Sequence, residues 1–193
     1  MDGRTARRER GRVAVLDAMV GLVQEGVIPP TAEQVASRAG VSVASLFRYF
    51  DDLEDLQRQM IARFLDRYAA SFDVPSFGRG PLDRRVRGFA HARATLYEAI
   101  APFARLTRAR SLERPTIATG LHEMRARLAA QVDGHFAPEL TVLGRARAED
   151  AAGCIVALTS FESWDLLQGD LGRTRRQIER AWSTTITATL TTP

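Results

Sequence analysis

The chain of 193 residues contains no lysine, so all 27 of its basic residues are arginines. This absence excludes enzymes that need a lysine amine, such as Schiff-base enzymes, kinases and P-loop ATPases, because a guanidinium cannot replace that amine. Cysteine is almost absent as well. The single Cys154 cannot form a disulfide within the chain, and we expect a cytoplasmic protein in which this residue is a packed thiol.

Long apolar runs are also missing. The longest uncharged apolar stretch covers residues 151–158, far below the roughly 20 residues that cross a bilayer, and we predict no membrane span. Several arginines precede an apolar run that begins at Val13, as in a signal peptide. However, Asp17 interrupts this run, and Gln24 and Glu25 stand where a cleavage site would have small residues. The pattern therefore predicts a basic arm that leads into an amphipathic helix.

Recognisable catalytic and metal-binding motifs are scarce. The three histidines, at positions 91, 122 and 135, have no partners at metal-ligand spacing. We therefore predict no metal, no cofactor and no catalytic residue, and expect that the protein is not an enzyme. The alternative is an all-helical enzyme that uses carboxylates, which would show turnover and no DNA affinity. Its candidate residues are Glu98, Glu123, Glu162 and Asp165.

Apolar residues recur at three- and four-residue steps throughout, without the strict alternation of strands, so the predicted fold class is all-α. The first helix is expected at about 8–25, and a longer helix follows Asp52 to about Tyr68. Residues 71–80, rich in proline and glycine, predict a loop before a larger helical unit. In that unit we expect a helix broken near Pro102, a loop at 134–144, and final helices at about 147–168 and 173–189.

The most informative segment is Thr31–Phe50. Thr31 and Gln34 have the spacing of a capping box, Gly40 suits a left-handed turn, and Ser42 is a good N-cap for the next helix. Two short helices joined by such a turn must cross steeply, which requires small or apolar residues on their inner faces. Ala36 and Leu46 meet this requirement. The spacing predicts a helix-turn-helix, although many helical hairpins that do not bind DNA share it.

The net charge of +4 is unevenly placed. Five arginines lie in the first twelve residues, against only Asp2 and Glu9. Such an excess favours attraction to a polyanion, and a solvated tail is the alternative. Together with the helix-turn-helix pattern it favours nucleic acid, with Arg8 and Arg10 as candidate phosphate contacts.

The N-terminal fifty-odd residues resemble the DNA-binding domain of the TetR family of bacterial transcriptional regulators. The matching motifs are Q-E-G at 24–26, T-x-x-x-V-A-x-x-A-G-V at 31–41, S-x-x-S-L-F-R-Y-F at 42–50 and D-x-L-E-D-L at 51–56. The resemblance implies a helix-turn-helix DNA-binding domain with a basic arm at 1–51 and a helical ligand-binding and dimerisation domain at 52–193. It further implies a homodimer on a palindromic operator in double-stranded DNA.

The resemblance also assigns roles to residues of both helices of the motif. Thr31 and Ser42 are expected near phosphates, and Arg48 at a guanine or a phosphate. The residues expected to face bases are Val43, Ala44 and Ser45, and those expected at the sugar-phosphate backbone or thymine methyls are Phe47 and Tyr49.

One position departs from the family pattern. Family members often have a phosphate-binding lysine near the start of the fourth helix, where this chain has Leu53 among four carboxylates. Such carboxylates repel phosphate. Our hypothesis is that the N-terminal arginines supply the missing contacts.

For the larger unit the resemblance implies an effector pocket and a dimer interface. Candidate pocket residues are Phe89, Tyr97, Phe103, Leu121, Met124, Phe161 and Trp164, with His91, His122, Glu162 and Asp165 as polar contacts; they suggest an apolar or aromatic small molecule. Candidate interface residues are Ile155, Leu158, Trp182 and Ile186. Aromatic and aliphatic stripes also build cores, and that alternative is open for both sets. We expect a repressor that leaves its DNA when the effector binds. The alternative is a repressor that does not respond to a small molecule.

Overall fold

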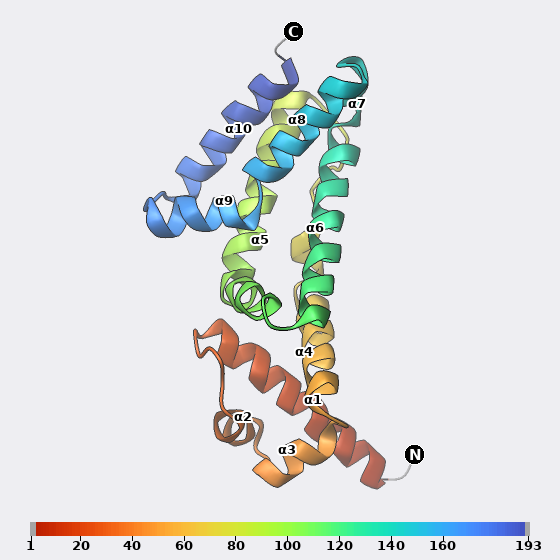
Figure 1. The fold of residues 1–193 in the computed structure, drawn as a ribbon, viewed down its shortest axis with the longest axis vertical. Helices are drawn as coiled ribbons and strands as arrows, with labels where there is room; N and C mark the ends of the chain where they lie inside the picture. The colour runs from red at the N-terminus through yellow and green to blue at the C-terminus, as the bar shows by residue number, and fades with distance from the viewer. Residues whose placement is uncertain (1–2, 192–193) are drawn as a thin grey trace. The chain divides into compact units, whose positions relative to one another are not determined.

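The computed structural model describes residues 3–191, except for the side chains of Arg4, Leu53, Glu54 and Gln57. Within this range every regular element is a helix, and no strand occurs. The predicted all-α fold class is therefore confirmed. The architecture is a helix-turn-helix unit followed by a larger helical unit (Figure 1).

The N-terminal unit ends at Ala69 and contains four helices (Figure 1). They are α1 (Gly3–Gln24), α2 (Ala32–Ala39), α3 (Val43–Tyr49) and α4 (Leu53–Arg67). This boundary lies after α4, whereas the sequence predicted it after residue 51. The physical reason is that α4 packs on α1, where Arg63 Nε forms an ion pair with Asp17 Oδ1 at 2.7 Å.

The core of the N-terminal unit joins α1 to the two helices of the motif. Leu16, Val20 and Val23 are buried on one face of α1. Opposite them, Ala36 of α2 and Leu46 of α3 are 2% and 3% exposed, as expected where two short helices approach closely. The positions that the helix-turn-helix spacing requires to be small or apolar are thus interior ones.

The C-terminal unit begins at Ala70, inside a short 3-10 helix, η1 (Ala69–Phe72). Its longer helices are α5 (Leu82–Ser111) and α6 (Pro115–His135), and α5 lies against both α6 and the last helix (Figure 1). The remaining elements are α7 (Ala137–Val142), α8 (Arg145–Leu158), α9 (Phe161–Asp165), one π-helical turn, η2 (Leu166–Asp170), and α10 (Arg175–Thr191).

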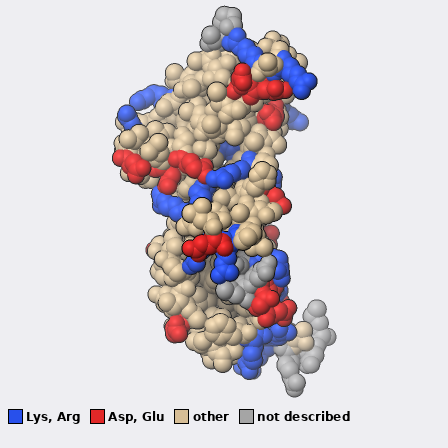
Figure 2. Space-filling model, viewed as in Figure 1, with Lys and Arg blue, Asp and Glu red and all other residues tan. Residues whose placement is uncertain are grey.

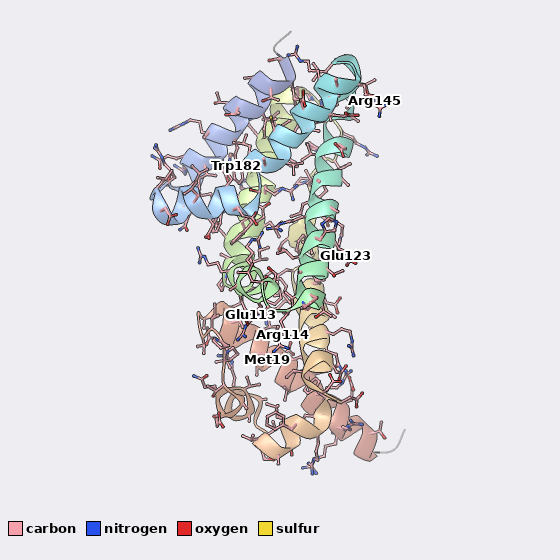
Figure 3. All side chains as sticks on the ribbon, in the orientation of Figure 1. Met19, Glu113, Arg114, Glu123, Arg145 and Trp182 are labelled. Carbon is pink, nitrogen blue, oxygen red and sulfur yellow. The ribbon has the colours of Figure 1, made fainter. Side chains whose placement is uncertain are left out.

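Aromatic rings fill the centre of this unit around Tyr97. Its ring meets Phe161 edge-on at 5.6 Å and Trp182 edge-on at 6.4 Å between centroids. Trp182 is fully buried, and Figure 3 shows it on the inner side of α10. Ile155 and Ile186 are also fully buried, while Leu158 is half-buried. Three of the four candidate interface residues are therefore core side chains of the single chain.

Four predicted boundaries were wrong. Helix α1 begins at Gly3 rather than near residue 8, so the arginines expected in an arm lie on the helix itself. Helix α5 continues through Pro102, although proline has no N–H and removes one hydrogen bond of the helix. The neighbouring Ala101, Phe103 and Ala104 are buried, and their packing keeps the helix continuous. The predicted loop at 134–144 contains α7, where a proline suits the first turn and Leu140 is buried. The predicted helix at 147–168 is interrupted after Leu158, because Ser160 caps a new helix by accepting a hydrogen bond from the Ser163 N–H at 3.1 Å.

Cys154 is another correction, because it is exposed on α8 rather than packed. The buried side of α8 carries Ala151 and Ile155. Cys154 precedes Ile155 by one residue and so points about 100° away from it around the helix.

Candidate nucleic-acid interface

Local hydrogen bonds build the helix-turn-helix. The Thr31 N–H donates to Gln34 Oε1 at 2.8 Å, and Thr31 Oγ1 accepts from the Gln34 N–H at 3.3 Å, so the predicted capping box is present. Gly40 ends α2 with φ of 67°, and the next N–H, of Val41, donates to the Ala36 carbonyl at 3.0 Å. This left-handed turn, which favours glycine, sets the direction in which α3 leaves the motif.

A chain of hydrogen bonds organises one face of α3. Ser42 caps the helix by accepting from the Ser45 N–H at 3.1 Å, and its hydroxyl donates to Ser45 Oγ at 2.9 Å. Arg48 Nη2 donates to the same Ser45 oxygen at 2.9 Å. These residues lie at three-residue steps on one side of the helix. Their polar groups form a preorganised strip with a guanidinium at its end.

The apolar residues of α3 divide between the surface and the interior. Phe47 is 65% exposed, unusual for a phenylalanine, whereas Leu46 beside it is buried. Ala44 is exposed and Val43 half-buried. Apart from Leu46, α3 therefore offers small, apolar and hydroxyl side chains to an external partner, which are the types that contact thymine methyls and phosphates in a major groove.

Tyr49, at the end of α3, packs against α1 where Gly11 has no side chain. A Cβ at position 11 would overlap the Tyr49 hydroxyl. Nearby, Arg8 Nη2 of α1 donates to the Arg48 carbonyl at 3.2 Å, at the carbonyl end of α3 where a cation is favourable. Helix α1 is thus joined to the end of α3 by a ring contact and a hydrogen bond.

A groove of about 890 Å³ lies between α1 and the turn of the motif. The charged residues that line it, within the described part of the chain, are all arginines: Arg7, Arg8, Arg10 and Arg48. Because the chain has no lysine, all blue side chains in Figure 2 are arginines, and several gather on the N-terminal unit near the start of the chain. A groove to which residues with described side chains contribute four guanidinium groups and no carboxylate attracts a phosphate backbone. Of these residues, Arg7 was not among the predicted contacts.

The start of α4 is acidic, but two of its carboxylates have internal partners. Asp52 caps α4 by accepting from the Asp55 N–H at 2.7 Å, and Asp55 accepts from Gln59 and Arg58, each at 2.7 Å. The hydrogen bond from Gln59 is the main cause of the lowered pKa of Asp55. The prediction for the Leu53 side chain lies outside the part of the chain that the structure describes.

The candidate pocket residues of the C-terminal unit do not all meet. Tyr97 and Phe161 line one cavity of about 140 Å³, together with Glu162. Phe89, Phe103 and Trp164 are buried core residues, and Leu121 and Met124 are half-buried on α6. Arg93 also lines the cavity and was not predicted, although it lies four residues after Phe89 and four before Tyr97, on the same face of α5.

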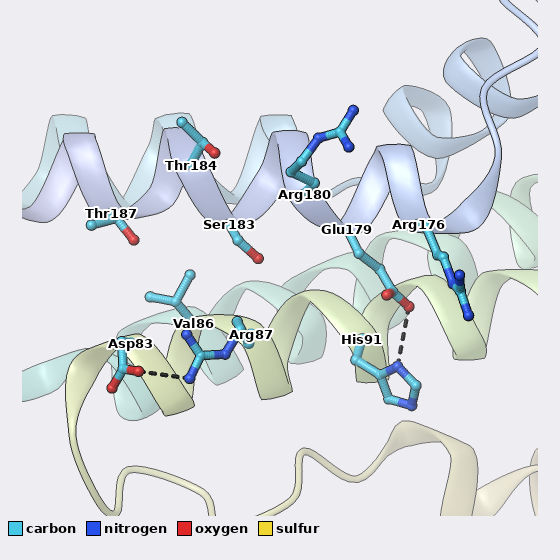
Figure 4. Close-up of a pocket in the computed structure, with 10 residues that line it drawn as sticks. All are labelled: Asp83, Val86, Arg87, His91, Arg176, Glu179, Arg180, Ser183, Thr184 and Thr187. Atoms are coloured by element: carbon cyan, nitrogen blue, oxygen red, sulfur yellow. Dashed lines mark hydrogen bonds and ion pairs between the residues drawn. The ribbon is translucent and has the colours of Figure 1, made fainter.

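The remaining polar candidates are dispersed. His91 lies in an open groove of about 700 Å³ between α5 and α10, where its Nδ1 is 3.1 Å from Glu179 Oε1 (Figure 4). His122 and Glu123 are exposed on α6. The other candidate carboxylates form ion pairs with different arginines: Glu98 with Arg175, Asp165 with Arg105, and Glu162 with Arg108 and Arg125. The structure does not bring the predicted carboxylates into one catalytic pair.

None of the helices formed by residues 3–191 is long and apolar enough to span a membrane. No group of three or more metal-ligating side chains occurs among the described residues.

Solved structures of two bacterial proteins share this fold. A transcriptional regulator from Rhodococcus sp. Rha1 matches with a TM-score of 0.60 and 20% identity, over 95% of each chain. A candidate transcriptional regulator from Streptomyces coelicolor A3(2) matches with a TM-score of 0.63 and 24% identity, over 96% of this chain and 99% of that one. The chain has the fold of these regulators. No protein-family model matches it, and no curated protein matches it by sequence.

Proposed function

We propose that the protein is a DNA-binding transcriptional regulator of the TetR type rather than an enzyme. The observation that carries this proposal is the groove lined by four arginines, beside a helix-turn-helix whose exposed face has hydroxyl and apolar side chains. In this arrangement α3 enters the major groove, and the arginines of α1 bind the flanking phosphates. The likeness in fold to two regulators supports the same conclusion.

The proposed contacts follow from exposure and position. Ser42 and Thr31 lie at helix starts, where hydroxyls and backbone N–H groups meet phosphates. Arg48, held by Ser45, reads a guanine or a phosphate, and Phe47 meets thymine methyls or the sugar-phosphate backbone. The N-terminal arginines supply the phosphate contacts that Leu53 cannot make.

The proposed regulator acts in the cytoplasm as a homodimer on a palindrome. Its half-sites are expected about one helical turn apart, roughly 34–36 Å. The dimer surface is assigned to the outer sides of α8 and α10, which pack on each other and carry exposed small residues: Ala146, Gly153, Cys154 and Ala157 on α8, and Ala181, Thr184, Thr185 and Ala188 on α10. Small side chains let helices of two copies approach closely in a four-helix bundle.

The proposed effector is a small molecule that binds the C-terminal unit and releases the repressor from DNA. Release requires that the effector bind one arrangement of the two reading heads better than the other. The 140 Å³ cavity favours this reading over a repressor without an effector.

A mobility-shift assay on the DNA that flanks the protein's own gene tests the function. We expect specific binding that Ser45→Arg combined with Tyr49→Ala weakens by about ten-fold to a hundred-fold. Arg145→Ala is the matched control, because Arg145 is a highly exposed arginine of the C-terminal unit (Figure 3). If the double variant binds like the wild type, α3 is not the reading helix.

The dimer surface has a separate test in sedimentation experiments. Thr184→Arg, on the exposed side of α10, is expected to give monomers that bind the operator weakly. Thr119→Arg, on the exposed side of α6, is the control and should remain dimeric. A dimeric Thr184→Arg variant would place the interface elsewhere.

A further inference from the structure

Arg93 is a buried cation that has no counter-charge among the described residues. It lies in the middle of α5 and is 3% exposed. Its guanidinium donates one hydrogen bond, from Nη2 to the Leu128 carbonyl at 3.1 Å, and lies 4.8 Å from the centroid of the Phe89 ring. No carboxylate of the described residues forms an ion pair with it. Burial lowers the pKa of Arg93, yet a guanidinium in a protein keeps its proton.

A second buried arginine on the same helix, Arg85, has the hydrogen-bond partners expected of a purely structural residue. Arg85, 5% exposed, forms an ion pair with Glu139 and donates to the carbonyls of Gly80 at 3.0 Å and His135 at 2.6 Å. Its three nitrogens are all used by the protein. Arg93 has a similar depth and no such set of partners, so its remaining hydrogen-bonding capacity is available to something else.

The cavity of about 140 Å³ lies beside Arg93. Tyr97, Leu128, Val156 and Phe161 give it mostly apolar walls. Burial raises the pKa of Tyr97 to about 12, and its hydroxyl donates to the Thr159 carbonyl at 2.8 Å, so the phenol is neutral and already bonded. An engineered apolar cavity of about 150 Å³ holds one benzene molecule, which sets the size of an occupant here.

The other charged groups at the cavity are two arginines that share one carboxylate. Glu162 accepts hydrogen bonds from Arg108 Nε at 2.8 Å and from Arg125. Burial by itself would raise the pKa of Glu162, but these two hydrogen bonds outweigh it and lower the pKa to about 2. Glu162 is therefore an anion shared by two arginines, and these three groups together carry one net positive charge. Arg93 is the arginine of the cavity to which residues 3–191 offer no carboxylate, so its charge can be matched by an anionic ligand.

We propose that this cavity binds a small monocarboxylate, with the carboxylate paired to Arg93 and an aromatic or short branched apolar group against Tyr97 and Phe161. A guanidinium fork fits a carboxylate through two parallel hydrogen bonds, and a buried pair of this kind excludes neutral molecules of the same shape. The effector role of this ligand rests on the proposed function, but its binding does not. The effector that the sequence predicts to be apolar or aromatic is therefore proposed to carry a carboxylate as well.

Calorimetry without DNA tests the binding, with benzoate, isobutyrate and acetate as probes and benzamide as the neutral match of benzoate. We expect at least one of the acids to bind with a Kd of about 10 mM or lower, a range suited to so small a ligand. Benzamide should have a Kd at least about ten-fold higher than benzoate. Arg93→Met should abolish binding while the protein stays folded, because methionine replaces the aliphatic part of the arginine side chain and is itself apolar. Arg105→Met, at an exposed arginine of the same helix, should bind the acid like the wild type.

Two more variants keep the test decisive if Arg93→Met does not fold. Arg93→Lys retains the charge but not the fork, and a loss of about ten-fold in affinity is expected. Val156→Phe fills the cavity without touching the charge and should abolish binding. The proposal is overturned if none of the acids binds, if benzamide binds as well as benzoate, or if Val156→Phe leaves binding intact.

The mobility-shift assay remains an independent measurement. A protein that binds benzoate in calorimetry but no DNA would retain the cavity site and lose the proposed function. A protein that binds its operator but none of the three acids would retain the function and lose the carboxylate site.

Discussion

The two units of the chain place their polar groups in different ways. In the N-terminal unit the strip on α3 links Ser42, Ser45 and Arg48 through hydrogen bonds that span three residues each. In the C-terminal unit the bonds at the cavity span far more: 62 residues from Tyr97 to Thr159 and 35 from Arg93 to Leu128. A site built from local bonds can be recognised in a short motif, whereas a site built from distant partners cannot.

The largest expected effect concerns the core of the C-terminal unit. Trp182→Ala should lower the free energy of unfolding by about 3–5 kcal/mol, because it removes a fully buried ring from beside Tyr97. Urea unfolding monitored by circular dichroism measures this loss, with Arg176→Gln, at an exposed residue of the same helix, as the control. A loss that appears only at low protein concentration would mean that Trp182 belongs to a dimer interface instead.

The next effect concerns the basic groove of the N-terminal unit. Replacing Arg7, Arg8 and Arg10 by glutamine should weaken operator binding by about 2–3 kcal/mol and reduce its salt slope by about three, because each phosphate contact releases about one counterion. Fluorescence anisotropy over a range of salt concentrations measures both quantities. The matched control replaces three exposed arginines of the other unit: Arg114, Arg145 and Arg173. An unchanged slope in the first variant would show that these arginines do not replace the phosphate contact that is missing at Leu53.

One glycine in each unit gives a comparison of backbone conformation, because replacement by alanine should change stability in opposite directions. Gly40→Ala should destabilise the N-terminal unit by about 1–2 kcal/mol, because φ of 67° is unfavourable for a residue with a Cβ. Gly120→Ala should instead stabilise the protein by up to about 1 kcal/mol, because Gly120 lies within α6 with open space around it. Thermal unfolding of both variants checks the two signs, and equal signs would contradict the assigned turn.

The smallest expected effect is a dependence of stability on pH from His135. This ring is fully buried; its Nδ1 accepts from the Gly78 N–H at 3.1 Å, and its Nε2 lies 3.1 Å from the Arg85 carbonyl. Burial is the main cause of its lowered pKa. The unfolded chain therefore binds a proton more readily, and stability should be full above about pH 6.5 and fall as the pH drops through the folded pKa.

Denaturant unfolding at pH 7.5 and 5.5, chosen as about one unit on either side of the ordinary histidine pKa, measures this dependence. His135→Gln should show a smaller difference between the two conditions than the wild type. His122→Gln, at an exposed histidine of the same helix, should leave the difference unchanged. An undiminished difference in the first variant would assign the acid sensitivity to other groups.

The sequence predicted the N-terminal unit more accurately than the C-terminal one, for the same local reason. The capping box at Thr31, the turn at Gly40 and the N-cap at Ser42 are all present, because each depends on bonds within a few residues. The continuous α5 at Pro102 and the exposed Cys154 were not predicted, because distant packing decides them.

Composition and periodicity by themselves determined that the chain is all-α, that it has a helix-turn-helix, and that arginine is the cation available for a phosphate. Only the tertiary structure decided which arginines share one groove, that Trp182 is a core residue, and that Arg93 is buried beside a cavity while no carboxylate of residues 3–191 pairs with it. The reason is that a helix fixes the spacing of its own side chains, but the partner that neutralises a buried charge comes from another helix and is set by packing.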